Sequence, residues 1–360
     1  MDGGMPDSLA TLNLVPHVAS PQPATRISDW RPEWLREADQ ATVDVSVCIA
    51  NWNCHDYLYR CLESLLDVPQ GVSVEVIVVD NASTDGAADM VLREFPDVIL
   101  VRNDENRGFA AASNQAADLA RGNYLFFLNN DTIVPPMSLS RLVAFAAANP
   151  QFGMVGPRLK DGLGNLQISY RRKPTLRAML HRASFLRWTG IFRNAYDQYR
   201  RDGFDPEGVR PVEVLMGAAV LMPKSLYLKT GGWDDGFRFG VEDVEFSDRV
   251  GREKPLVHLP LVEIIHFGRV SSRQNVTFAA PNLMIGYVRY FRKSGAPAWA
   301  LAGYKMVFTL DAPVQLVGKS LQYLWRVCMG AHPEKADKSR QAVRGGWHFL
   351  TRDLLRFWRA

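Results

Sequence analysis

Apolar residues along this chain fall into short runs that alternate with amphipathic stretches, beginning at Val43. Short β-branched runs indicate buried strands, whereas apolar residues spaced three and four apart indicate helices. Strands that alternate with helices predict an α/β fold built on a doubly wound, mostly parallel sheet. The predicted strands cover 45–50, 74–79, 98–101 and 124–128, and the predicted helices cover 57–66, 87–95 and 109–120.

The pattern is looser in the second half of the chain. Residues 158–210 hold twelve Lys or Arg and five Asp or Glu, with little periodicity. An apolar run then predicts a strand over 212–222, Gly231 and Gly232 predict a turn, and 242–251 predicts a helix. Ligands of doubly wound sheets bind at the carboxyl ends of the strands, so polar residues there are the candidates for chemistry.

Composition and charge divide the chain further. The hydrophobic fraction of 47% and the charged fraction of 22% are those of a globular protein with a sizeable core. Residues 1–42 contain five prolines and predict a mobile N-terminal arm. Residues 284–360 hold thirteen Lys or Arg and four Asp or Glu, a net charge of +9 against +4 for the whole chain. They predict a basic, amphipathic helical C-terminal region after a core domain at 43–283.

Several classes of protein and segment are disfavoured. The four cysteines form no C-x-x-C pair and predict reduced, partly buried thiols of a cytosolic protein. We expect no secretory signal and no spanning helix, because the apolar stretch 296–324 is interrupted by Lys305, Asp311 and Lys319. No G-x-G-x-x-G follows the first strand, and Gly318-Lys319-Ser320 lacks the remainder of a P-loop.

Two polar turns are candidate nucleotide contacts. Asp80 ends the second strand, where its carboxylate can accept the imide N–H of a uracil or thymine ring; Ser83 to Asp85 can equally be read as a helix cap. Asn106 and Gly108 follow the third strand and open a helix, whose N-terminus is a ready anion site. An ordinary turn and cap is the alternative for both.

Asn130 and Asp131 follow the fourth strand directly. Oxygen ligands at a strand end suit Mg²⁺ or Mn²⁺, which would neutralise a diphosphate leaving group. Asp131 is the predicted metal ligand, and a simple Asx turn is the alternative. His266 ends a later apolar run and is a candidate second metal contact, although a lone histidine there is more often structural.

Acidic residues cluster before and within the helix predicted at 242–251. Glu242 and Asp243 lie in its first turn, where the helix dipole stabilises carboxylates, and Asp234 lies in the preceding turn. A general base needs to be ionised and held at a fixed point, which this position provides. The apolar approach through Phe237, Phe239 and Val241 can form the wall of a sugar pocket.

Taken in order, these segments resemble those of the family-2 glycosyltransferases, and within them bacterial rhamnosyltransferase-like members. The resemblance covers about Val45 to Ser272. It rests on V-S-V-C-I-A-N-W-N from Val45, D-N-A-S-T-D-G from Asp80, E-N-R-G-F-A-A-A-S-N-Q-A from Glu105, L-N-N-D-T from Leu128, M-G-A-A-V-L from Met216, G-G-W-D-D-G-F from Gly231 and E-D-V-E-F-S-D-R from Glu242.

The resemblance implies a GT-A fold with a nucleotide-binding half at 43–157 and an acceptor half at 158–283. It implies that Asp243 is the catalytic base, supported by the acidic Glu242 and Asp234. The implied metal ligands are Asp131 and His266, and the implied nucleotide contacts are Asn51, Asp80, Asn106, Gly108 and Asn130. Such families often carry D-x-D where this chain has Asn129-Asn130-Asp131, which puts its metal affinity in question.

The function implied is inverting transfer of a sugar from a nucleotide diphosphate donor to a saccharide or polyprenyl-linked acceptor in cell-envelope glycan synthesis. The resemblance suggests dTDP-rhamnose as the donor, with a UDP-sugar as the alternative. A glycoside hydrolase, a nucleotidyltransferase and an inactive sugar-nucleotide-binding scaffold are the competing classes. A hydrolase needs no metal, and a nucleotidyltransferase usually has a Gly-rich loop where Asn51-Trp52-Asn53 stands.

The location follows from the C-terminal charge. Arg352, Arg356 and Arg359 alternate with apolar residues as in a basic amphipathic helix, and 171–201 mixes arginines with Leu176, Met179, Leu180, Phe185, Leu186 and Trp188. We predict a cytoplasmic protein bound peripherally to the inner face of the plasma membrane, with no nucleic-acid partner. The alternative is that these helices pack on the core or on a second subunit, as in a homo-oligomer.

Overall fold

The computed structural model describes residues 43–200, 207–268, 276–330 and 332–360. The predicted arm at 1–42 lies outside these residues, as do Arg201 at the end of the basic segment and Ser271-Ser272 at the end of the predicted motif after His266.

The first half of the chain alternates strands and helices as the hydrophobic pattern predicts. Its elements are β1 (Val45–Asn51), α2 (His55–Leu66), β2 (Val74–Asp80), α3 (Ala87–Glu94), β3 (Ile99–Arg102), α4 (Phe109–Leu119), β4 (Tyr124–Asn129), β5 (Thr132–Ile133) and α5 (Ser138–Ala148). Strands β3, β2, β1 and β4 are neighbours in that order, and all their pairings are parallel. Their carboxyl ends therefore meet along one edge of the sheet.

The second half adds strands of mixed direction to the same sheet. Its elements are β6 (Met154–Lys160), β7 (Leu166–Gln167), β8 (Tyr170–Arg171), α6 (Leu176–Leu180), α7 (Ser184–Thr189), α8 (Arg193–Arg200), β9 (Arg210–Val212), β10 (Val214–Leu215), β11 (Ala219–Pro223), α9 (Lys224–Thr230), α10 (Glu242–Gly251) and β12 (Leu256–His266). The sheet continues from β4 through β11, β6 and β12 to β5, with β11 antiparallel to both neighbours.

The single strand predicted over 212–222 is wrong, because three short strands replace it. β9 pairs with β12, β10 pairs with β8, and β11 pairs with β4. Each strand ends before the next one begins with a new partner. The segment Met216–Ala218, between β10 and β11, lines the cavity described below. An apolar run reports burial but not which strand it pairs with, so the pattern could not reveal the breaks.

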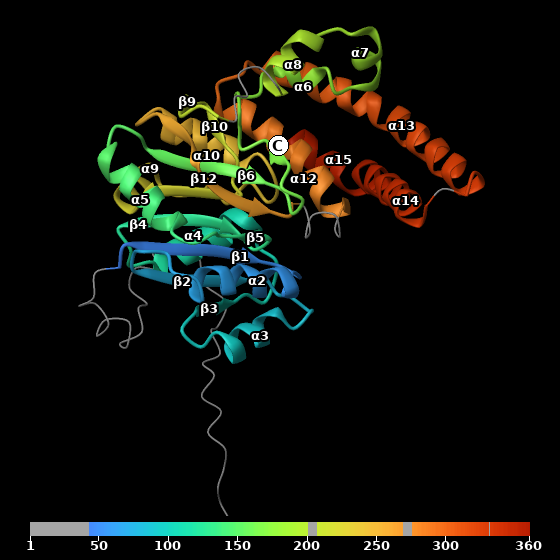
Figure 1. The fold of residues 1–360 in the computed structure, drawn as a ribbon. Coiled ribbons are helices and arrows are strands. Elements are labelled where there is room, and N and C mark those ends of the chain that lie inside the picture. Colours follow the sequence, from blue (N-terminus) through green and yellow to red (C-terminus); the bar gives the residue numbers. More distant parts are fainter. Residues whose placement is uncertain (1–42, 201–206, 269–275, 331) are drawn as a thin grey trace, which may run out of the picture.

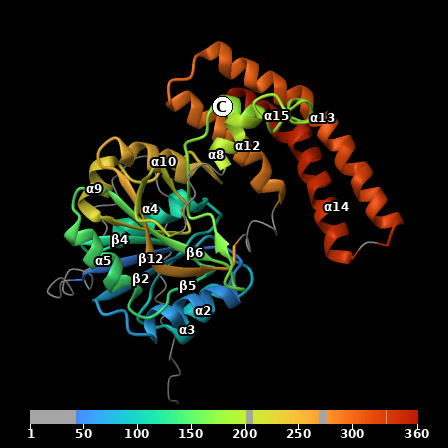
Figure 2. The same cartoon turned by 45° about the horizontal axis from the view of Figure 1, so that its top comes forward.

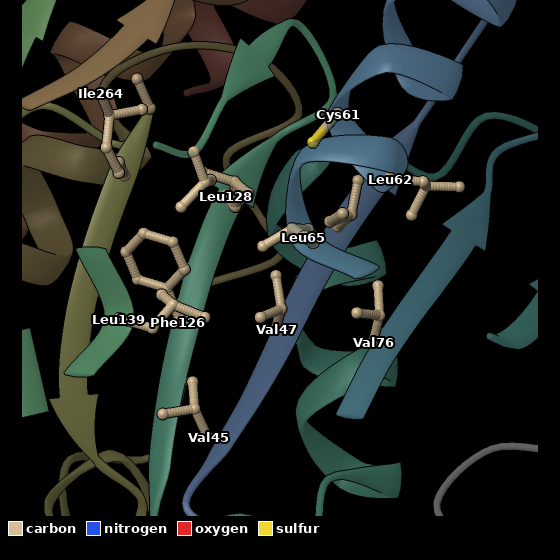
Figure 3. Close-up of a cluster of buried hydrophobic side chains, with 14 of the residues drawn as sticks. Val45, Val47, Cys61, Leu62, Leu65, Val76, Phe126, Leu128, Leu139 and Ile264 are labelled. Carbon is tan, nitrogen blue, oxygen red and sulfur yellow. The ribbon is translucent and has the colours of Figure 1, made fainter. Parts of the chain in front are cut away.

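Alternate side chains of the strands build a separate core on each face of the sheet. Val45, Val47 and Ile49 pack with α2, α3 and α5 through Leu62, Met90 and other buried residues. Figure 3 shows Val45, Val47 and Leu62 of this core. Cys48, on the opposite face, packs with α4, α9 and α10. Cys48, Cys54 and Cys61 are buried free thiols, and Cys328 is an exposed one.

The C-terminal region consists of helices α12 (Val276–Lys293), α13 (Ala298–Cys328), α14 (Pro333–His348), a π-helical turn η2 (Phe349–Asp353) and α15 (Leu354–Arg359). In two views α13 and α14 run side by side, away from the sheet (Figures 1 and 2). A third core joins α12, α13, η2 and α15 to α6, α8 and the start of α10 through residues such as Tyr287, Phe308 and Phe357. The predicted α/β class with a helical extension is thus confirmed, and the predicted boundary after residue 283 falls inside α12.

No helix in the described part of the chain is long and apolar enough to cross a membrane.

Candidate active site

A cavity of about 350 Å³ opens at the carboxyl ends of β1 and β4. It brings together most of the predicted site residues, because the loops after β1, β2, β3 and β4, the segment before β11 and the first turn of α10 all reach this edge of the sheet. Its walls are formed by Ala50, Asn51, Trp52, Asn81, Asn106, Gly108, Phe109, Asn129, Asn130, Asp131, Met216, Gly217, Ala218, Arg238, Phe239, Glu242, Asp243, His266, Phe278 and Ala279.

A chain of hydrogen bonds links the ends of three strands. Asn130 Nδ2 donates to Asn51 Oδ1 at 2.7 Å, and Asn51 Nδ2 donates to Asp80 Oδ1 at 2.9 Å. The other oxygen of Asp80 accepts the N–H of Ser83 at 2.9 Å. Asp80 is thus buried and does not line the cavity itself. Asn51, which does line it, is hydrogen-bonded to Asp80.

Neither Ser83 nor Thr84 caps helix α3, which was the alternative reading of this segment. Helix α3 begins after Gly86, and Asp85 Oδ1 accepts the N–H of Ala87 at 3.1 Å. The Ser83 hydroxyl instead accepts the N–H of Asn53 at 2.9 Å. Ser83 therefore fastens the loop after β1 to the loop after β2, which fixes the position of Asn51.

The turn before α4 is built around Gly108. Its φ of +87° lies in the region that favours glycine, and a Cβ there would come within 2.7 Å of the Arg238 carbonyl oxygen. Asn106 Oδ1 accepts the Gly108 N–H at 2.9 Å, which shapes the turn. This close approach brings the Arg238 segment next to the first turn of α4, so both line one side of the cavity.

Asp131 and His266 meet where β12 pairs with β5. Asp131 Oδ1 lies 3.3 Å from His266 Nε2, and the Asp131 carbonyl accepts the N–H of Phe267 at 2.9 Å. His266 Nδ1 lies 2.9 Å from Gln167 Oε1, while Gln167 Nε2 donates to the His266 carbonyl at 2.7 Å. Gln167 thereby orients the ring so that Nε2 faces Asp131 and the cavity.

This donor set fits a divalent cation completed by a ligand. A carboxylate oxygen and an imidazole nitrogen converge, and an oriented second ring nitrogen is typical of histidines that bind metals. The described residues contain no group of three or more His, Cys, Asp and Glu side chains placed to hold a metal by themselves. An ion here needs further oxygens from a diphosphate or water, as Mg²⁺ commonly does.

Glu242 and Asp243 project from the first turn of α10 across the cavity from β1 and β4. Asp243 Oδ1 accepts the N–H of Val244 at 2.9 Å, whereas Glu242 Oε2 has no hydrogen-bond partner among the described residues. Burial raises the pKa of Glu242 to about 8, and the neighbouring Asp243 carboxylate adds to the effect. Burial also raises the pKa of Asp243, but the Arg171 guanidinium and backbone N–H groups oppose this. Asp243 is thus the member of the pair that ionises first.

The backbone entering α10 is strained. Val241 precedes Glu242 and has a φ of +73°, which is rare for a β-branched residue. The Val241 side chain is buried in the third core, which holds it in this conformation. Strain of this kind concentrates where the surrounding fold fixes the position of functional groups.

Asp234 and two of the predicted wall residues lie elsewhere. The Asp234 carboxylate is paired with Arg289 Nη2 at 2.8 Å and Lys293 Nζ at 2.7 Å, so it ties the loop before α10 to α12. Phe237 and Val241 are buried in the third core, and only Phe239 of the three lines the cavity. The partners of Asp234 are 55 and 59 residues away in the chain, so no local pattern could reveal them.

Sequence reasoning missed several residues of the cavity wall. Arg238 is the only Lys or Arg among the described lining residues, and Trp52, Met216 and Phe278 add apolar surface. Arg238 lies between two of the predicted motifs. Its position four residues before Glu242 was the only feature of the sequence that could have indicated a place near the site. Phe278 comes from α12, in a stretch after His266 for which the hydrophobic pattern predicted no element.

Comparisons with known proteins found similarity to glycosyltransferases. Residues 46–205 match the family model described as glycosyl transferase family 2. An N-acetylglucosaminyl-diphospho-decaprenol L-rhamnosyltransferase of Mycobacterium tuberculosis is 30% identical over 207 residues. The match covers 54% of this chain and 66% of that relative, just under two thirds of its length. A UDP-Glc:alpha-D-GlcNAc-diphosphoundecaprenol beta-1,3-glucosyltransferase of Escherichia coli is 32% identical over 110 residues, 30% of this chain and 43% of that protein.

A solved structure shows the same fold. GalNAc-T7, determined with UDP, GalNAc and Mn²⁺, superposes with a TM-score of 0.52 at 18% identity, over 70% of this chain and 48% of that one. The predicted GT-A type of α/β fold is confirmed by this likeness.

Proposed function

The chain belongs to glycosyl transferase family 2, and from this premise we propose that it is an inverting, metal-dependent hexosyltransferase that uses a nucleotide diphosphate sugar. One observation carries the proposal. Two pairs of groups with different chemistry, Asp131 with His266 and Glu242 with Asp243, line a single cavity at the carboxyl edge of the sheet.

We assign the base to Asp243. It accepts the proton of the acceptor hydroxyl as that oxygen attacks the anomeric carbon from the face opposite the diphosphate, so the configuration inverts. The Arg171 charge favours the ionised form of Asp243 against the effect of burial. Glu242, with its pKa raised to about 8, stays protonated near neutral pH, so it adds no negative charge that would oppose ionisation of Asp243.

We assign the donor's diphosphate to the opposite wall. Asp131 and His266 would hold Mg²⁺ or Mn²⁺, and the bound ion would neutralise charge on the leaving diphosphate. Arg238 contributes a fixed positive charge to the same space. The nucleoside lies toward Asn51, Asp80, Asn106, Gly108 and Asn130, whose hydrogen bonds fix the loops of this wall.

For the donor we favour dTDP-rhamnose. The mycobacterial relative is described as a rhamnosyltransferase. The apolar surface of Met216, Phe239 and Phe278 beside Asp243 supports a 6-deoxy sugar, because a methyl group leaves no hydrogen bond unsatisfied there. A UDP-sugar is the alternative donor, since the Escherichia coli relative is described as using UDP-Glc.

For the acceptor we favour a polyprenyl diphosphate-linked saccharide in cell-envelope glycan synthesis, with a nascent polysaccharide as the alternative. The names of both relatives include a diphosphopolyprenol. An enzyme acting on such an acceptor works at a membrane surface, so we place the protein in the cytoplasm, attached peripherally to the inner face of the plasma membrane.

A donor panel tests the proposal. The protein is mixed with dTDP-rhamnose, dTDP-glucose, UDP-glucose or GDP-mannose, with Mg²⁺, Mn²⁺ or EDTA, and release of the nucleoside diphosphate is followed. We expect one deoxythymidine or uridine donor to be consumed with metal and spared with EDTA. Consumption unaffected by EDTA would contradict the metal assignment. Binding of a donor without consumption of any donor would favour an inactive sugar-nucleotide-binding scaffold, and binding of no donor would contradict the proposal.

A further inference from the structure

The loop that leads into α10 depends on support from outside the sheet. Residues 234–241 belong to neither a helix nor a strand, although they supply Arg238 and Phe239 to the cavity wall. They end at Val241, whose φ of +73° is unfavourable for a β-branched residue, and the next two residues are the carboxyl pair of the site. An irregular segment with a strained end keeps one conformation only where its surroundings fix it.

Helix α12 contacts this loop closely at its strained end. An added Cβ on Gly240 would come within 2.7 Å of the Leu283 side chain. About one helical turn further along α12, an added Cβ on Gly286 would lie 2.9 Å from the Gly240 carbonyl oxygen and 3.1 Å from Val241 Cγ2. The backbone of α12 therefore lies against the loop where the loop takes its positive φ angles, and glycine at position 286 leaves room for this approach.

Two cations further along α12 hold the other end of the loop. Arg289 Nη2 donates to Asp234 Oδ1 at 2.8 Å, and Arg289 Cζ lies 5.3 Å from the centroid of the Phe237 ring. Lys293 Nζ donates to Asp234 Oδ2 at 2.7 Å and to Glu245 Oε1 at 2.6 Å, so one ammonium group joins the loop to α10 itself. Both carboxylates are largely buried, so water and salt screen these contacts less than they screen surface ion pairs.

We propose that α12 positions this loop for catalysis, with Gly286, Arg289 and Lys293 as the positioning residues. Their spacing of three and four residues keeps them on one side of the helix, which meets the loop from its end back to its start. Through them α12 fixes the place of Arg238 and the point at which α10 begins with its two carboxyl groups. A misplacement of about 1 Å can cost about 100-fold in rate. The inference rests on the transferase activity proposed above and gives a C-terminal helix a part in it.

The segment before the loop and the nucleotide wall have separate support. Asn114 of α4 accepts the N–H of Trp233 and donates to the Trp233 carbonyl oxygen, both at 2.9 Å. The chain of hydrogen bonds through Asn51, at the ends of the strands, involves no residue of α12. Loss of the α12 contacts should therefore release residues 234–241 while the opposite wall of the cavity stays in place. Substitutions in α12 can thus separate positioning from folding.

A pair of glycine substitutions in the full chain tests the close approach. Gly286→Ala adds a methyl group against the Gly240 carbonyl oxygen, so the loop has to shift. The matched control is Gly303→Ala, at an exposed glycine of α13 with nothing within 4 Å of its Cβ position. Both changes replace a helical glycine with alanine, so they differ in the contact with the loop.

A second pair of variants tests the ionic contacts and remains informative if Gly286→Ala fails to fold. Arg289→Gln with Lys293→Gln removes the two cations that hold Asp234. The control is Arg292→Gln with Arg340→Gln, which removes the same amount of charge from exposed positions of α12 and α14.

Amide hydrogen exchange of residues 234–241 is measured in every variant, together with kcat on the donor that wild type consumes and the affinity for dTDP and UDP with Mn²⁺. Both α12 variants should exchange faster in this loop, and kcat should fall about 10- to 100-fold because the base is misplaced. Nucleotide affinity should stay within a few-fold of wild type, since the strand-end wall is intact. Both controls should behave as wild type, and Gly303→Ala should be no less stable, because alanine favours a helix more than glycine does.

Three results would overturn the proposal. Unchanged exchange of the loop in both α12 variants would show that α12 does not hold it. Faster exchange with normal kcat would show that transfer does not depend on the position of the loop, and equal losses of kcat and nucleotide affinity would indicate general damage to the fold. No turnover of any donor by wild type would instead contradict the proposed function, and the exchange rates would still decide whether α12 supports the loop.

Discussion

At the scale of single residues, the site depends on two carboxyl groups that share one environment but differ in their neighbours. Arg171 and backbone N–H groups favour ionisation of Asp243, whereas Glu242 Oε2 has no partner among the described residues. The sequence indicated that both carboxylates occupy the first turn of a helix, and α10 has the predicted bounds. It could not separate their roles, because the groups that do so are distant in the chain.

Asp243→Asn should abolish sugar transfer while leaving donor binding nearly intact. The amide keeps the shape of the side chain but cannot accept a proton, so kcat should fall on the order of 10²–10⁴-fold. Turnover and donor affinity are measured in parallel, with Asp235→Asn as the control because it changes an exposed acid of the preceding loop. Turnover within a few-fold of wild type would move the base to Glu242.

Glu242→Gln should change how stability depends on pH. The pKa of Glu242 is about 8 in the folded protein and about 4.3 in an unfolded chain, so between these values the folded state keeps a proton that the unfolded state has released. The free energy of unfolding of wild type therefore falls as pH rises through this window. The variant lacks this proton, and its stability relative to wild type should increase by at least about 1 kcal/mol between pH 6 and 8.

Urea denaturation at several pH values measures this difference, and Glu105→Gln, at an exposed position, is the control. If the curves of wild type and Glu242→Gln stay parallel from pH 6 to 8, the Glu242 carboxyl does not hold the extra proton.

Asp131→Ala should remove metal-dependent nucleotide binding together with activity. No other Asp or Glu among the described residues is paired with His266, so the variant keeps one protein ligand at most. Calorimetric titration of Mn²⁺ with a nucleoside diphosphate measures the effect, and Asp104→Ala changes an exposed acid as the control. Unchanged metal-dependent affinity would place the ion on other residues.

At the scale of elements, the sheet shows what a hydrophobic pattern can and cannot predict. The first four strands and the helices between them lie within two residues of the predicted bounds, because a parallel α/β unit has a strong local signature. The pattern failed at 212–222, where one apolar run forms parts of three short strands that pair with three different partners. It also missed Phe278 and Arg238, since contributions from α12 and from the loop before α10 depend on tertiary packing.

Gly108→Ala should damage the turn that opens α4. The substitution adds strain at φ +87° and places a Cβ 2.7 Å from the Arg238 carbonyl oxygen. Gly164→Ala is a matched control, because Gly164 has φ +83° but nothing within 4 Å of its Cβ position. We expect the control to cost about 1–2 kcal/mol of stability and Gly108→Ala to cost about 1–3 kcal/mol more, with weaker donor binding. Equal costs in the two variants would show that the loop yields without affecting the site.

At the scale of the whole molecule, the C-terminal helices share a hydrophobic core with the segment that carries Glu242 and Asp243. Tyr287, Phe308 and Phe357 share one core with Phe237 and Val244, so deleting 284–360 would open that core as well as remove any membrane surface. The basic residues of α15 suggested an amphipathic surface helix, yet Phe357 is fully buried. The sequence did not reveal that Leu310, Val317 and Leu321 of α13 are exposed, because the exposure of apolar side chains on a helix is decided by which helices pack beside it.

Phe357→Ala should destabilise the protein although the residue lies near the end of the chain. The ring packs edge-on against Phe349 and fills the third core, so its loss should cost about 3–5 kcal/mol. Leu355→Ala, at a leucine that is 70% exposed, should cost little. Thermal unfolding of the two variants measures the contrast, and similar midpoints would mean that α15 is not anchored as described.

The neighbourhood of Asp131 and His266 has a consequence for the order in which the protein matures. Asn129 and His266 meet across 137 residues of chain, and they do so only when β12 pairs with β5. Contacts between residues so distant in sequence must close a large loop, which slows their formation. A growing chain can assemble β1 to β4 from consecutive segments long before β12 has been synthesised. Ribosome-bound chains that end before Leu256 should therefore have a folded nucleotide wall but no metal-dependent affinity for a nucleoside diphosphate, so synthesis itself delays activity until the fold is nearly complete.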